Sequence, residues 1–315
     1  MKKTFRTFLL AAAGLALPAQ AQETTEQQPR ANPVRSVLDG ILDRVLGPEA
    51  TPQAEAAAQD DTTPGTIGLD TILAADFRAE DQPRDQYRHP AETLAFFRVQ
   101  PNMTVAEYAP GGGWYSRVLA PYIAPQGRYL AVNFDTDGAD MDAEQRQRAD
   151  AWPVRFATSV QQSTGVPASA VTAFESDDIP AGLEGSADRI LIFRNIHSML
   201  NSGNALSELR NLRALLADNG LVGVVQHRAP ESASWADSNG SRGYVKQTDV
   251  VALFDLAGFE LVQTSDINAN PNDSADYPGG VWTLPPVFRE GDTDRARYEA
   301  IGESDRMTLL FRKAR

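Results

Sequence analysis

Three consecutive glycines after a strand-like segment form the part of this chain best suited to hold a ligand. In "TVAEYAPGGGWY" an acid, Glu107, stands within the strand expected over residues 104–109, and a helix is expected over 115–123. Glycine tolerates positive φ and has no Cβ, so this turn lets the backbone pass close beneath an adenosine or a phosphate group. A tight turn that binds nothing is the alternative. The segment lacks the Lys-Ser or Lys-Thr of a P-loop and the GxGxxG spacing of a dinucleotide site.

Two histidines near the ends of expected strands are candidate general bases. His197 occurs in "RNIHSM" and His227 in "VVQHRAP", each after an apolar run. An unperturbed histidine has a pKa near 6.5, which suits proton removal at neutral pH. Each histidine could instead be a structural cap bonded to a neighbouring loop. His89, in "YRHPAE" ahead of an expected helix, fits a capping or packing role better.

Alternating strand-like and helix-like segments must position these residues. Strands are expected over residues 104–109, 128–134, 171–176, 187–194, 220–227 and 306–313, with helices over 115–123, 140–152 and 205–217, and a helix followed by a strand within 250–264. Apolar strands that alternate with helices indicate a parallel sheet covered on both sides. The pattern therefore predicts a doubly wound α/β domain, which binds ligands at the carboxyl ends of its strands.

A long segment over residues 266–304 separates the last two strands. Its Pro, Gly, Asn and Asp content enforces turns, and Trp282 stands among them. Long ordered insertions at the rim of such domains often cover substrate. The sequence predicts a lid here, with a rigid strap over the sheet edge as the alternative. The residues expected to face a substrate are Asn268, Asn270, Tyr277 and Trp282.

The first residues resemble a secretory signal. Residues 1–21 combine a basic start, an apolar run from Phe8 to Leu17 and the small-x-small site Ala19-Gln20-Ala21. The run is about half the roughly 20 residues that span a bilayer, so we expect cleavage after Ala21 rather than a retained anchor. Residues 22–67 have the composition of a flexible tether with one amphipathic helix over 34–46, which leaves residues 68–315 for one domain.

Charge and composition narrow the partners. The chain carries a net charge of −13, and removal of a signal with three basic residues makes it more acidic. Such a charge argues against a nucleic-acid backbone as partner, and no basic amphipathic helix is present for an anionic membrane surface. The absence of cysteine fits an exported protein without disulfides. We expect a periplasmic or secreted bacterial protein with a small-molecule partner, and no metal is called for.

The glycine turn and the later strands together resemble class I S-adenosylmethionine-dependent methyltransferases. "VAEYAPGGG" resembles the motif of an acid followed by a G-x-G-x-G turn, with Ala109 at the first glycine position. "GRYLAVNFD", "FESDDIP", "ADRILIFRNIHSM" and "LADNGLVGVVQH" resemble the second to fifth strands, and "GFELVQTSDIN" and "DRMTLLFRK" the sixth and seventh. The chain from Asp76 onward is similar to exported predicted methyltransferases of bacteria. The resemblance implies a Rossmann-like, seven-stranded, mostly parallel sheet with an antiparallel last strand.

The resemblance also implies S-adenosylmethionine as cofactor and a set of residues around it. Glu107 would lie near its methionine end, and the glycines beneath the adenosine. The acid that usually holds the ribose falls at Asn133, a departure that Asp135 could offset, and Asp177 or Asp178 would meet the adenine amine. The implied cofactor-binding residues are Glu107, Ala109, Gly111, Gly112, Gly113, Asn133, Asp135, Asp177 and Asp178.

Two classes of function follow from these features. In the first, the protein transfers a methyl group to an unknown small molecule, with His197 or His227 as base. In the second, the fold is kept as an exported binding or scaffold module without catalysis. A dinucleotide-dependent oxidoreductase shares the sheet, but the glycine spacing disfavours it.

Overall fold

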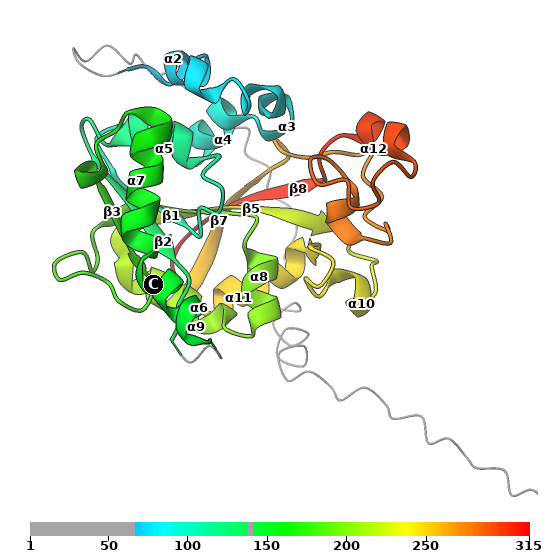
Figure 1. Ribbon diagram of the computed structural model, residues 1–315. Coiled ribbons are helices and arrows are strands. Elements are labelled where there is room, and N and C mark those ends of the chain that lie inside the picture. Colours follow the sequence, from blue (N-terminus) through cyan, green and yellow to red (C-terminus); the bar gives the residue numbers. More distant parts are fainter. Residues whose placement is uncertain (1–66, 138–140) are drawn as a thin grey trace, which may run out of the picture.

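The computed structural model describes residues 67–137 and 141–315 (Figure 1). The expected signal over residues 1–21, the helix over 34–46 and all but the last residue of the tether over 22–67 lie outside the described residues. No described helix is both long enough and apolar enough to cross a membrane.

A single mixed sheet organises the described chain. Its strands are β1 (Thr104–Tyr108), β2 (Arg128–Asn133), β3 (Val171–Glu175), β4 (Ala187–Phe193), β5 (Leu216–Ala229), β6 (Val245–Lys246), β7 (Phe259–Ser265) and β8 (Arg306–Lys313). The order is β3-β2-β1-β4-β5-β8-β7, with the short β6 beside the end of β5. Strands β1 to β5 pair in parallel, whereas β8 is antiparallel to both β5 and β7. This confirms the predicted α/β fold; β6 was not predicted.

Helices cover both faces of the sheet (Figure 1). One face carries α2 (Leu69–Leu73), α4 (Pro90–Phe96), α5 (Ser116–Ile123) and α7 (Trp152–Thr164), and the other carries α8 (Ile196–Ser202), α9 (Ala205–Leu215) and α11 (Gln247–Leu256). Each set closes over its own apolar core, because the parallel strands are apolar on both faces. The helix expected over 140–152 is two helices, α6 (Ala143–Asp150) and α7, because Pro153 begins a new helix.

The alternation of side chains along β1 decides which residues reach which face. Val105 belongs to the core beneath α5, and Ala106 and Tyr108 belong to the core beneath α9. Glu107 therefore points to the α5 face, where its bond to Tyr129 of β2 also lies. The side chains of Glu107 and Tyr108, the last two residues of the strand, therefore lie on opposite faces of the sheet.

The segment between β7 and β8 is ordered and tied to the sheet. It contains a 3-10 helix (Gly280–Thr283) and α12 (Arg295–Ile301). Just after α12, Glu303 binds arginines of the segment that leads into α4. That segment includes a 3-10 helix (Gln82–Arg84) and α3 (Asp85–Arg88). The remaining short helices are Asp76–Arg78, Ala168–Ala170 and α10 (Trp235–Ser238).

Candidate functional site

The glycine turn after β1 has the left-handed backbone that its sequence predicts. Gly111 and Gly113 have φ of 56° and 74°, and Ala109 has φ of 45°. A non-glycine residue in this region costs about 1–3 kcal/mol, so the surrounding structure must hold Ala109 there. Its N–H donates to the carbonyl of Val132 on β2 at 2.7 Å. The turn is therefore fixed to the neighbouring strand.

A first cavity of about 730 Å³ opens at the carboxyl ends of β1, β2 and β4. Polar groups from the end of β2 meet apolar and aromatic side chains there, a composition typical of small-molecule sites. Residues that line it include Tyr108, Ala109, Gly111, Asn133, Phe134, Asp135, Trp152, Asn195 and Met199. The cavity thus lies where a doubly wound sheet is expected to bind a ligand.

A second cavity of about 290 Å³ lies beside the first, across the glycine turn. It is lined by Asp81, Arg84, Arg88, Glu107, Ala109, Pro110, Gly111, Gly112, Trp114, Tyr115, Arg117, Phe193, Arg194 and Asn195. Ala109, Gly111 and Asn195 line both cavities. The Asn195 amide donates to the carbonyl of Ala109 at 3.0 Å, which ties the turn to the end of β4. The two cavities are thus neighbours that share one wall.

Glu107 is a buried acid on the wall of the second cavity. Its Oε2 accepts hydrogen bonds from Ser116 Oγ at 2.8 Å and from the Tyr129 hydroxyl at 2.6 Å. Burial raises the pKa of Glu107 to about 7, although these two hydrogen bonds oppose the rise. Glu107 therefore exchanges its proton near neutral pH.

Several arginines also line the second cavity. Arg84 and Arg88 bind Glu303 at 2.6 Å and 3.1 Å. Arg194, just after β4, is held at φ 58°, and its N–H donates to the carbonyl of Val225. Burial and the nearby charge of Arg306 lower the pKa of Arg194 to about 10. These arginines were not predicted. Arg194 and its neighbour Asn195 nevertheless lie at the end of a predicted strand, where a doubly wound sheet is expected to bind its ligand.

The expected cofactor residues divide between the cavities. Asn133 and Asp135 line the first cavity, Glu107 and Gly112 line the second, and Ala109 and Gly111 line both. Gly113 shapes the turn without being part of either lining. Asp177 and Asp178 are exposed beyond β3 and line neither cavity, although a carboxylate oxygen of Asp177 lies within 4.8 Å of one on Asp135, which lines the first. Their contact with the adenine stays a prediction.

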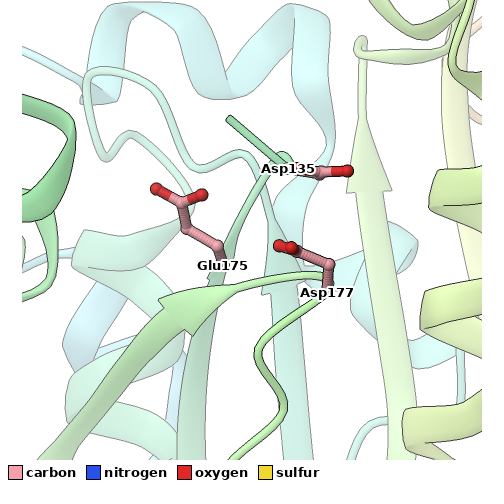
Figure 2. Close-up of side chains that lie close together, drawn as sticks. All are labelled: Asp135, Glu175 and Asp177. Carbon is pink, nitrogen blue, oxygen red and sulfur yellow. The ribbon is translucent and has the colours of Figure 1, made fainter. Parts of the chain in front are cut away.

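Three carboxylates gather at the ends of β2 and β3 (Figure 2). The ligand atoms of Asp135, Glu175 and Asp177 lie within 4.8 Å of one another. Two of the three already have partners, because Glu175 accepts from the backbone and hydroxyl of Thr136 and Asp135 accepts from the N–H of Asp137. These hydrogen bonds give the cluster a structural role in shaping the loop after β2, and we assign it no metal.

The two candidate histidines lie together, and neither lines a cavity. Their ring centroids are 5.7 Å apart, and the His197 ring lies 5.9 Å from that of Trp282. His197 Nδ1 is 3.4 Å from Gln226 Oε1, and His227 Nδ1 is 2.6 Å from Ser304 Oγ. Burial lowers the pKa of both histidines. Their described contacts are those of packing residues under the 266–304 segment, and the catalytic role stays a prediction. His89 lies at the junction of α3 and α4, in the left-handed region.

The expected substrate residues of the 266–304 segment also lie outside both cavities. The Asn268 amide donates to Thr93 and Thr308, each at 3.0 Å. The Asn270 amide donates to two backbone carbonyls, and Tyr277 packs with Leu284 and Tyr298. Trp282 lies beneath Arg289, whose guanidinium is 4.6 Å from its ring. In this structure the segment is a strap fixed to the sheet, and these residues hold it in place.

Comparison with known proteins finds relatives by structure but not by sequence. No protein-family model and no protein of curated function matches the chain. An S-adenosylmethionine-dependent methyltransferase from Aquifex aeolicus is similar in structure at 14% identity, over 64% of this chain and 94% of that one, with a TM-score of 0.42. The [4+2]-cyclase SpnF is similar at 13% identity, over 76% and 86%, with a TM-score of 0.47. The methyltransferase CalH, solved with S-adenosylhomocysteine, is similar at 14% identity, over 79% and 62%, with a TM-score of 0.40.

Proposed function

We propose that this protein binds S-adenosylmethionine and transfers its methyl group to a small molecule outside the cytoplasm. The observation that carries the proposal is the pair of adjoining cavities that meet at the glycine turn, on the carboxyl ends of β1, β2 and β4. A nucleoside joined to an amino acid needs two such compartments with a bare backbone between them. Export rests on the signal-like residues 1–21.

The first cavity fits the adenosine part of the cofactor. Asn133 and Asp135 offer amide and carboxylate oxygens to ribose hydroxyls, and a carboxylate acceptor makes the stronger hydrogen bond. Phe134, Trp152 and Met199 offer apolar surface to a purine ring. Asn133 alone would be a weaker ribose partner than the usual acid, so Asp135 supplies the charge in this proposal.

The second cavity fits the amino-acid part. Glu107, once ionised, would attract the cofactor's ammonium, and Gly112 presents backbone with no side chain: a Cβ built there meets no atom within 4 Å. The bound cofactor supplies a methyl group whose bond to sulfur breaks with the electron pair kept by sulfur, while the acceptor's lone pair forms the new bond. The chain's own task is to hold the two partners in line.

Calorimetric titration of the full-length chain tests the proposal. S-adenosylmethionine and S-adenosylhomocysteine should bind, and NAD should not, because the turn lacks the dinucleotide spacing. If neither sulfur compound binds at millimolar concentration, methyl transfer is ruled out and the non-catalytic binding module becomes the better account.

A further inference from the structure

The second cavity contains more positive charge than its acids neutralise. Four arginines line it, together with Asp81 and Glu107. Asp81 is occupied by Arg117, whose Nη2 and Nε bind its two oxygens at 2.8 Å and 2.5 Å. Arg84, Arg88 and Arg194 are left without a carboxylate partner that belongs to the lining. The cavity therefore presents a cationic wall in a chain whose net charge is −13.

Glu303, which does not line the cavity, is the carboxylate partner of several arginines near it. Glu303 binds Arg84, Arg88 and Arg306, the last at 2.9 Å. Arg194 feels the charges of Glu303 and Arg306, yet the described residues include no hydrogen-bond acceptor for its guanidinium. Four guanidinium groups thus face one carboxylate. Buried charges need partners, so this arrangement favours an anion in the cavity.

Two nearly buried donors on the same wall lack partners. Arg88 is 3% exposed, and its Nη1 has no hydrogen-bond partner among the described residues. Trp114 is 6% exposed, and its Nε1 likewise has none. The two side chains are in contact, since the Arg88 guanidinium lies 4.5 Å from the centre of the Trp114 ring. A buried donor without a partner is costly, and an anionic group bound against this wall would offer acceptors for such donors.

The proposed cofactor does not account for this charge. Its methionyl part carries one carboxylate and one ammonium, and its sulfonium makes the whole molecule cationic. The carboxylate offsets a single positive charge, which the cofactor's own ammonium already balances, and the positive sulfur adds to the local excess. A second, net anionic molecule restores the balance.

We propose that the methyl acceptor is a small acid, whose carboxylate or phosphate group binds in the second cavity against Arg88, Arg194 and Trp114. This inference rests on the proposed function, because it names the class of acceptor for the same site. The anionic group orients the acceptor beside the glycine turn. Arg194 is the best test residue, because its side chain has no described hydrogen bond that its removal would break.

The test measures binding of two simple anions to the full-length chain. Inorganic phosphate and succinate are titrated in a calorimeter into the wild type, Arg194→Gln and the control Arg210→Gln, which changes an exposed arginine of α9 that lines neither cavity. At least one anion should bind the wild type and bind Arg194→Gln at least tenfold more weakly, with Arg210→Gln unchanged. The anion that binds more tightly identifies the acceptor group as phosphate or carboxylate.

Titration of S-adenosylhomocysteine separates the inference from the proposed function. Arg194→Gln should weaken S-adenosylhomocysteine much less than it weakens the anion, and the anion should still bind when S-adenosylhomocysteine is present. If the anion competes with S-adenosylhomocysteine and Arg194→Gln weakens both equally, the arginines hold the cofactor's own carboxylate and the inference is wrong. If S-adenosylhomocysteine binds and neither anion does, the inference is also wrong but the proposed function stands. If only the anions bind, the proposed function fails, and the acceptor role fails with it.

Discussion

Glu107 shows how one buried acid can link the fold to the chemistry. It stands at an interior strand position, where burial raises its pKa from 4.5 to about 7. Between these two pH values the folded state keeps a proton that the unfolded state has lost. The free energy of unfolding therefore falls as pH rises from about 4.5 to 7, and this effect ends above the folded-state pKa.

Glu107→Gln should remove this dependence. The amide keeps an oxygen for Ser116 and Tyr129 but does not ionise. Relative to the variant, the wild type should lose on the order of 3 kcal/mol of unfolding free energy between pH 4.5 and 7. Urea unfolding of both proteins at several pH values measures the difference. A constant difference across this range would show that Glu107 does not titrate there.

Arg194 and Asn195 show what residue-level reading of the sequence missed. They lie at the end of the fourth expected strand, but His197, just beyond them, was the predicted base, because histidine is the commoner base. Glu107, Gly111, Gly112, Asn133 and Asp135 do line the cavities, because strand ends and the turn fix their positions, and their contacts with the cofactor stay a prediction. Arg84 and Arg88 come from a segment before the sheet, and only the tertiary structure brings them to the cavity.

At the scale of elements, Glu303 joins parts that are far apart in sequence. It connects Arg84 and Arg88, before α4, to Arg306 at the start of β8. Burial alone would raise its pKa, but the three arginines hold the pKa of Glu303 down to about 2. Its stabilising effect is therefore complete above the unfolded-state pKa of 4.5 and is lost as pH falls toward 2.

Glu303→Gln should be strongly destabilising at neutral pH. Removal of one member of a buried ionic cluster costs about 3–5 kcal/mol, because the remaining charges stay buried without compensation. Urea unfolding at pH 7 should show this loss, and the loss should shrink toward pH 2. The exposed pair Arg295 and Glu299 on α12 offers a control, where Glu299→Gln should change stability by less than about 1 kcal/mol. Equal effects of the two substitutions would contradict the account.

The 266–304 segment was predicted to cover substrate, with a strap as the alternative, and its described contacts are those of a strap. Asn268 binds Thr93 of α4 and Thr308 of β8, and Asn270 binds backbone carbonyls near the end of the segment. Composition predicted its turns, but the partners of Asn268 depend on Thr93 and Thr308, which are distant in sequence. The predicted strands, in contrast, lie close to their expected bounds because their apolar pattern is local, whereas most of α7 and all of α8 were not predicted. The short β6 carries no such pattern, since two residues have no period.

His197 on α8 permits a direct comparison of the packing and catalytic assignments. It is 9% exposed and packs near Gln226 and Trp282. His197→Ala should lower the unfolding free energy by about 1–3 kcal/mol while leaving the affinity for S-adenosylhomocysteine unchanged. Thermal unfolding and calorimetry measure the two effects. A variant with unchanged stability and turnover reduced a hundredfold or more would instead establish the histidine as a base.

At the scale of the whole molecule, an acidic chain encloses a cationic cavity. We expect this contrast to disfavour nucleic acids and anionic membranes, whose binding needs clustered surface cations, and we propose that it admits small anions. The two cavities lie where the strand order of the sheet reverses, between the neighbouring strands β1 and β4. Export is proposed from the sequence alone.

Expression in a bacterial host checks the proposed export. Cleavage after Ala21 should release a protein that begins at Gln22 into the osmotic-shock fraction. Intact-mass measurement of that fraction identifies the new N-terminus. A full-length species in the membrane pellet would show that residues 1–21 act as an anchor.

The central claim is that the two cavities form one site beneath the glycine turn, and Gly112 tests it most directly. A Cβ at Gly112 meets no atom within 4 Å, and its φ lies outside the left-handed region, so a side chain there strains nothing. Gly112→Ala and Gly112→Val should keep the wild-type melting temperature and weaken S-adenosylhomocysteine binding progressively, with at least a tenfold loss for valine. Unchanged affinity in a folded Gly112→Val protein would contradict the claim.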